Sequence, residues 1–138
     1  MNMESQNKRE CYSILLHLKR EIILGVGSLG VIKFPRGYYI YTGRDRKNVD
    51  KRIQRHMKKG KRCRWHVDYL TSPCHVKFVD FVIHTASADY ECKINKRISG
   101  LPGASIITPG FGSSDCRDSC GAHLIYFKEK PILRNYTF

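Results

Sequence analysis

A change of hydrophobic period in the middle of the chain constrains the fold more than any other feature. The run Tyr38-Tyr39-Ile40-Tyr41-Thr42 is strongly β-prone. After Gly43 the period lengthens, because Val49, Ile53 and Met57 recur every four residues. The sequence therefore predicts a strand that leads almost directly into a helix with an apolar stripe.

The other elements follow from shorter patterns. The central helix is expected to begin at Asp45 or Asn48 and to run to Lys59, while residues 65–70 fit either a strand or a helix. Strands are expected over residues 11–18, 22–24, 31–34, 76–84 and 123–127, and a short helix over residues 88–98. Because strands and helices interleave, the predicted fold class is α+β, with a small, largely antiparallel β-sheet flanked by helices.

The 138-residue chain has the composition of one globular domain, since 41% hydrophobic residues suffice for a core. Residues 1–10 are predicted to be a polar N-terminal extension, and residues 11–138 to be a single domain without repeats or linkers. No apolar run approaches the roughly 20 residues of a membrane helix, and no signal-type stretch is visible. We therefore expect a soluble, cytoplasmic protein without a membrane partner, and the oligomeric state stays open.

Most of the positive charge lies in one segment. The chain has a formal net charge of +13, and the segment from Arg44 to Arg64 carries 11 basic residues against Asp45 and Asp50. A field so concentrated is typical of proteins that bind polyanions, with phosphate backbones as the leading candidate. The alternative is a solvated helix face or a localisation signal.

Two segments carry a resemblance to a nuclease family. The strand end Tyr41-Thr42-Gly43, followed by the helix with Arg52 and His56 four residues apart, resembles the second half of the GIY-YIG nuclease signature. The first half is represented by Glu10-Cys11-Tyr12, which keeps the tyrosine and lacks the preceding glycine and isoleucine. The family's metal-binding glutamate corresponds to Glu91, on the later helix.

The wider resemblance covers about residues 11–127. Ordered blocks that carry it begin at Tyr12, Gly37, Trp65, Glu91 and Phe111. Together they resemble a little-characterised, largely prokaryotic branch of the GIY-YIG superfamily that is sometimes joined to endonuclease III. The resemblance implies a GIY-YIG-like fold.

The resemblance also implies a function, a metal-dependent endonuclease that hydrolyses phosphodiester bonds in DNA, with repair as one context. Glu91 would hold Mg²⁺ or Mn²⁺, and Arg52 would stabilise the charged phosphate. Tyr12 or Tyr41 would act on the attacking water, with its pKa lowered by the metal and nearby cations, and His56 would relay a proton or orient a tyrosine. The expected nucleic-acid-binding residues are Arg44, Arg46, Lys47, Lys51, Arg55, Lys58, Lys59, Lys61, Arg62 and Arg64.

Two departures from the signature keep an alternative open. The glycine and isoleucine before Tyr12 are missing, and the segment between Tyr12 and Tyr41 is long and contains Gly25, Gly27 and Gly30. That insertion is expected to add strands or a loop over the site. A domain with altered geometry could bind DNA or RNA without cutting it, so a non-catalytic binding module is the second hypothesis.

The cysteines and histidines allow a structural zinc site, which we do not favour. Cys116, Cys120 and His123 offer three ligands, and the fourth would come from Cys63, His66, Cys74 or His75. The spacing lacks the paired Cys-x2-Cys pattern that makes a zinc prediction strong. Buried reduced cysteines are the simpler interpretation.

Two further segments have a structural and a functional interpretation. Trp65 is expected in the core, while Asp68 either caps a turn or lines the cleft together with His66. The glycine-rich loop over residues 110–115 either approaches a phosphate through its N–H groups or makes a tight turn.

Overall fold

The computed structural model describes residues 10–45, 48–63, 65–73, 76–84, 90–112 and 122–133. It confirms the α+β class. Five antiparallel strands form the main sheet in the order β5-β1-β4-β7-β6, and two more form a separate hairpin. The main sheet consists of β1 (Glu10–Leu18), β4 (Gly37–Asp45), β5 (Val76–His84), β6 (Ala104–Ser105) and β7 (Leu124–Phe127). The hairpin consists of β2 (Ile22–Gly25), the 3-10 turn η2 (Gly27–Leu29) and β3 (Val31–Phe34).

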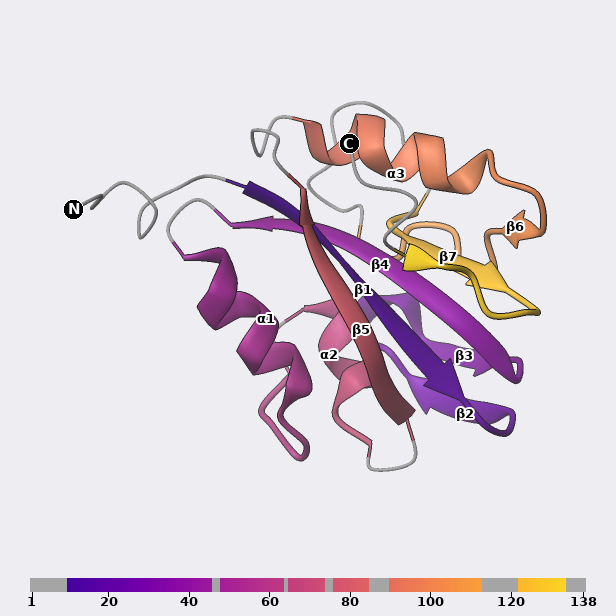
Figure 1. Ribbon diagram of the computed structural model, residues 1–138. Helices are drawn as coiled ribbons and strands as arrows, with labels where there is room; N and C mark the ends of the chain where they lie inside the picture. Colours follow the sequence, from indigo (N-terminus) through magenta and orange to yellow (C-terminus); the bar gives the residue numbers. More distant parts are fainter. Residues whose placement is uncertain are drawn as a thin grey trace.

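The helices cover both faces of the main sheet. Helices α1 (Val49–Met57) and α2 (His66–Thr71) lie below it and α3 (Glu91–Ser99) lies above it in Figure 1. The lower core joins one side of β1 and β4 to α1, α2 and the hairpin, and the upper core joins the other side to α3. Because both faces of β1 are covered, seven of its nine residues are buried, which explains its nearly continuous hydrophobic sequence. Within the described residues, no helix is both long and apolar enough to cross a membrane.

Helix α1 differs from its prediction in its end and in its buried face. It begins after Asn48, whose side chain accepts a hydrogen bond from the Lys51 N–H, so the second predicted start is confirmed. It ends at Met57, two residues before the predicted end. Met57 is 44% exposed, and His56 takes its place on the buried side because a 3.6-residue period turns that position toward the sheet.

Three other elements refine the predictions. The ambiguous segment at residues 65–70 is a helix, because the Asp68 carboxylate accepts the Trp65 N–H and satisfies the start of α2. The predicted helix at residues 88–98 begins at Glu91, and residues 85–89 lie outside the described part of the chain. The glycine-containing insertion adds the β2–β3 hairpin, which packs into the lower core beside α2.

Gly43 allows the ring of Tyr12 to cross from β1 over β4. The two residues are paired across the strands. A Cβ atom on Gly43 would lie 2.6 Å from the Tyr12 hydroxyl oxygen and 3.0 Å from Cε2 of Tyr41. The glycine at this position is therefore required by space, and both aromatic rings lie where it leaves room.

We predict that Gly43→Ala destabilises the protein by about 1–3 kcal/mol, because the added methyl group overpacks the buried Tyr12 ring. Denaturant unfolding measures the effect. Gly25→Ala is the matched control, since nothing lies within 4 Å of its added Cβ, and we expect a change of less than about 0.5 kcal/mol. Equal effects of the two substitutions would contradict this interpretation.

Candidate active site

Tyr12, Tyr41 and His56 form one buried cluster between β1, β4 and α1. The Tyr12 hydroxyl oxygen lies 2.7 Å from Nε2 of His56, and the two residues are 44 apart in the sequence. Ring centroids are 6.4 Å apart for Tyr12 and Tyr41, and 5.9 Å apart for Tyr41 and His56. The structure therefore brings three of the predicted catalytic residues into direct contact.

Burial keeps all three groups of this cluster uncharged at neutral pH. Loss of hydration raises the pKa of the Tyr12 and Tyr41 phenols well above the usual range. The Arg52 charge opposes this rise and the Glu91 charge adds to it, so both charged groups act on the tyrosine pair. Burial also lowers the pKa of His56 to about 3. Desolvation outweighs the chain's own nearby cations, and the expectation that a metal ion together with these cations lowers a tyrosine pKa stays a prediction.

Arg52 is held at the rim of the cluster by two contacts that the sequence analysis did not anticipate. Its Nε lies 3.1 Å from Oδ2 of Asp45, whose other carboxylate oxygen accepts the Asn48 N–H at 2.9 Å. Its guanidinium stacks 4.0 Å from the centroid of the Trp65 ring. The side chain remains 24% exposed, so a fixed cation stands where the buried cluster meets solvent.

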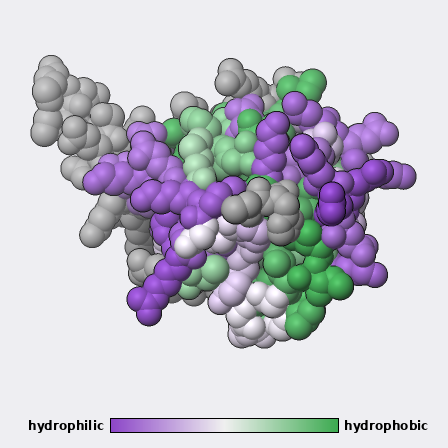
Figure 2. All heavy atoms as spheres, turned by 90° about the horizontal axis from the view of Figure 1, so that it is seen from below, coloured by the Kyte–Doolittle hydropathy of each residue, from purple (hydrophilic) through white to green (hydrophobic). Residues whose placement is uncertain are grey.

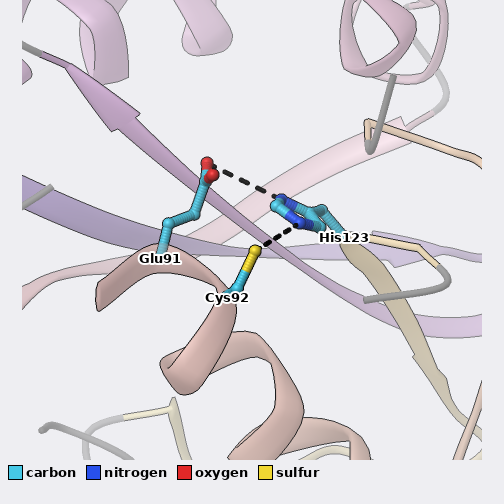
Figure 3. Close-up of side chains that lie close together, drawn as sticks. All are labelled: Glu91, Cys92 and His123. Atoms are coloured by element: carbon cyan, nitrogen blue, oxygen red, sulfur yellow. Dashed lines mark hydrogen bonds and ion pairs between the residues drawn. The ribbon is translucent and has the colours of Figure 1, made fainter. Parts of the chain in front are cut away.

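Glu91 lies in a second cluster at the start of α3, together with Cys92 and His123 (Figure 3). The Glu91 carboxylate is 3.6 Å from Nδ1 of His123 and 3.9 Å from Nε of Arg44. The Cys92 thiol is 3.7 Å from Nε2 of His123. One donor atom from each of the three residues lies within 4.8 Å of the other two. The sequence had suggested a different set, Cys116, Cys120 and His123, as a possible but not favoured zinc site, and both of those cysteines lie outside the described residues.

Strand pairing places His123 beside α3. The Thr42 N–H donates to the His123 carbonyl oxygen at 3.1 Å, and the His123 N–H donates to the Phe111 carbonyl oxygen at 2.7 Å. No spacing rule signals this neighbour, because His123 is 31 residues from Cys92.

The donor set bears on the expected metal. Glu91 offers a carboxylate oxygen, and Mg²⁺ is often held by one or two carboxylates plus waters, so this residue fits the expected ion. Cys92 and His123 are not ligands that Mg²⁺ prefers.

Several basic side chains of the basic segment form hydrogen bonds or ion pairs within the protein. The Arg55 guanidinium contacts the buried Asp68 carboxylate at 2.6 Å, and the Lys59 ammonium donates to the Thr71 carbonyl oxygen at 2.9 Å. The Lys61 ammonium donates to the Lys58 carbonyl oxygen at 2.6 Å, and burial lowers its pKa to about 8. These head groups stabilise α1 and α2, which is a structural use that a charge count does not reveal.

The remaining residues predicted to contact phosphate differ in their exposure and in their partners. Lys51, Lys58 and Arg62 are exposed, and Arg44 pairs with Glu91. Figure 2 shows hydrophilic side chains on the α1 side at the left and also on the opposite side at the right, so they are not confined to the α1 side. The predicted residues Arg46, Lys47 and Arg64 lie outside the described part of the chain.

The described contacts of the two segments with a double interpretation are structural, and residues 113–115 of the second segment lie outside the described part of the chain. Asp68 is buried and caps α2. Trp65 is partly buried beneath Arg52 and Arg55 and packs against the lower core, so it lies at the edge of the core and not inside it. The Gly112 N–H donates to Nδ1 of His66 at 2.8 Å in a turn where Gly112 has a φ of 69°.

The family model described as "Domain of unknown function DUF123" matches residues 11–137. The chain belongs to this family. No curated protein and no solved structure matches it. The description of the DUF123 family assigns no activity, so the function of this DUF123 chain has to be argued from its side chains.

We predict that the buried neutral His56 makes stability depend on pH. Its folded pKa of about 3 lies below the unfolded value near 6.5, so its contribution is complete above about pH 6.5 and is lost as pH falls toward 3. Between pH 7 and pH 5 the free energy of unfolding, measured with urea, should fall by about 2 kcal/mol more in the wild type than in His56→Gln.

His84, whose pKa burial lowers to about 4, contributes equally to both proteins and cancels in the comparison. An equal decrease in the free energy of unfolding between pH 7 and pH 5 in the wild type and in His56→Gln would show that His56 is charged in the folded protein at pH 5.

Proposed function

We propose that this chain is a metal-dependent endonuclease of the GIY-YIG type that hydrolyses phosphodiester bonds in DNA. The observation that carries the proposal is the hydrogen bond between Tyr12 and His56, with Tyr41 packed against both and Arg52 at the edge. The fold thus brings a phenol, an imidazole and a guanidinium together from two strands and a helix. Hydrolysis of a phosphodiester needs a positioned water, a proton acceptor and a cation beside the phosphate.

Each residue has a distinct role in this proposal. Arg52 neutralises the charge that develops on the phosphate oxygens, since its planar fork matches two of them. Tyr12 or Tyr41 would orient the attacking water, and the neutral His56 holds the Tyr12 hydroxyl in place through Nε2. Glu91 would hold Mg²⁺ or Mn²⁺, which lowers the pKa of bound water and stabilises phosphate charge.

The substrate is expected to approach from the charged rim. Tyr12 is fully buried, whereas Arg44, Arg52 and Glu91 keep 36%, 24% and 15% of their side chains exposed. A phosphate at this rim meets two guanidinium groups and the proposed metal ligand. The exposed residues Lys51, Lys58 and Arg62 would contact neighbouring phosphates without sequence preference.

Burial of the tyrosines favours a second candidate, a nucleic-acid-binding module that no longer cuts. Desolvation raises the pKa of both phenols, so neither Tyr12 nor Tyr41 ionises at neutral pH. Such a module would bind DNA or RNA with strong salt dependence and would release no product with either metal ion.

The decisive experiment compares binding and cleavage of labelled branched, nicked and single-stranded DNA, and of matching RNA, with Mg²⁺ or Mn²⁺. We expect metal-dependent cleavage of DNA by the wild type. Arg52→Ala should lower the rate at least about 100-fold, since it removes the cation from the transition state. Glu91→Gln should abolish metal-dependent cleavage, because the amide is a far weaker ligand.

Lys96→Ala is the control, since it removes an exposed cation of α3 that is not among the predicted phosphate contacts, and we expect a rate within about threefold of wild type. Cleavage that persists in both Arg52→Ala and Glu91→Gln would contradict the proposed function. Salt-sensitive binding without cleavage by the wild type would support the binding module instead.

A further inference from the structure

The cluster of Glu91, Cys92 and His123 has features that the proposed role of Glu91 alone does not need. Cys92 and His123 are buried, and the Cys92 thiol and the partly exposed Glu91 carboxylate both point toward the His123 ring, each toward a different ring nitrogen (Figure 3). The cluster thus combines a thiol, an imidazole and a carboxylate, one donor from each, all within 4.8 Å of one another.

This combination selects a particular class of ion. Thiolate and imidazole ligands suit Zn²⁺ and similar borderline transition metals, while Mg²⁺ and Ca²⁺ take oxygen ligands almost exclusively. Around a tetrahedral zinc ion, a sulfur and a nitrogen ligand lie roughly 3.5 Å apart, given bonds of about 2.3 and 2.0 Å. The Cys92 and His123 donors are 3.7 Å apart, close to that spacing.

The backbone also holds the two buried donors in place. His123 is tied on both sides, by the Thr42 N–H and by the Phe111 carbonyl, and Cys92 lies in the first turn of α3. The thiol faces Nε2, which is the ring nitrogen that an ion shared with Cys92 would use, while Glu91 faces Nδ1. Glu91 is the longest and most exposed of the three side chains, so it can turn its carboxylate toward an ion bound by the other two.

We propose that Cys92, His123 and Glu91 form a binding site for Zn²⁺, with the fourth ligand position left to water. Three protein ligands with one open position are typical of zinc sites that take part in chemistry, whereas structural sites are closed by four ligands. Zn²⁺ would use the Glu91 carboxylate that the proposed nuclease gives to Mg²⁺ or Mn²⁺, so the two kinds of ion would be alternative occupants, and Zn²⁺ binding can be measured without nucleic acid.

The test is a titration of the reduced, metal-free protein with Co²⁺, which reports its ligands through visible absorption. We expect one equivalent of Co²⁺ to give a thiolate-to-metal charge-transfer band that Zn²⁺ displaces and excess Mg²⁺ does not. The band should disappear in Cys92→Ser. Competition with Zn²⁺ should show that Glu91→Gln and His123→Gln each weaken Zn²⁺ binding at least about tenfold.

Two control variants separate this site from other thiols. Cys63→Ser changes a half-buried cysteine outside the cluster and should leave the band unchanged. The double variant Cys116→Ser/Cys120→Ser tests the other zinc set that the sequence allows, and it should also leave the band unchanged. Circular dichroism verifies that each variant is folded.

Three results would overturn the proposal. They are a folded wild type without a charge-transfer band, a band that survives Cys92→Ser, and a band lost in the Cys116→Ser/Cys120→Ser protein. Should Cys92→Ser fail to fold, undiminished Zn²⁺ affinity in both Glu91→Gln and His123→Gln would also overturn it. Failure of the nuclease proposal would leave each of these results unaffected.

Discussion

The hydrogen bond between Tyr12 and His56 connects the central strand to the helix that carries the basic segment. It joins β1 to α1 at 2.7 Å between two side chains that are both buried beside the lower core. The contact is possible because Gly43, opposite Tyr12, leaves space for the ring. A larger residue at position 43 would displace the phenol, and α1 would lose the partner that fixes its rotation.

The position of α1 then determines the rim of the candidate site. With His56 turned inward, Arg52 one turn earlier emerges at the edge, where Asp45 and Trp65 hold its guanidinium. The same rotation turns Met57 outward. A buried neutral pair therefore organises a charged, partly exposed rim.

Local patterns predicted the elements of this fold well, because they depend on neighbours in the sequence. The strand over residues 38–42 and the helix after it follow from a change of period, and Asn48 caps that helix as its residue type predicts. The order of strands in the sheet was not predictable, since it depends on pairings between residues far apart.

The candidate site was predictable only in part, for the same reason. Family resemblance located Tyr12, Arg52, His56 and Glu91, but no pattern in the sequence indicated that Asp45 holds Arg52. The neighbours of Glu91 also come from distant segments joined by strand pairing. Charge counting overstated the free cations, because it cannot distinguish an exposed lysine such as Lys58 from one bound to carbonyl groups, such as Lys59.

The central claim is that the Tyr12 hydroxyl bonded to His56 takes part in DNA cleavage, and removal of that one oxygen atom tests it most directly. Tyr12→Phe deletes the hydroxyl that contacts His56, and Tyr39→Phe deletes another buried hydroxyl of the same core, which donates to the Pro35 carbonyl oxygen. Single-turnover cleavage of DNA should fall about 100-fold or more in Tyr12→Phe, with DNA affinity unchanged, and should stay near wild type in Tyr39→Phe. A Tyr12→Phe protein that is folded and cleaves DNA within about threefold of the wild-type rate would contradict the account.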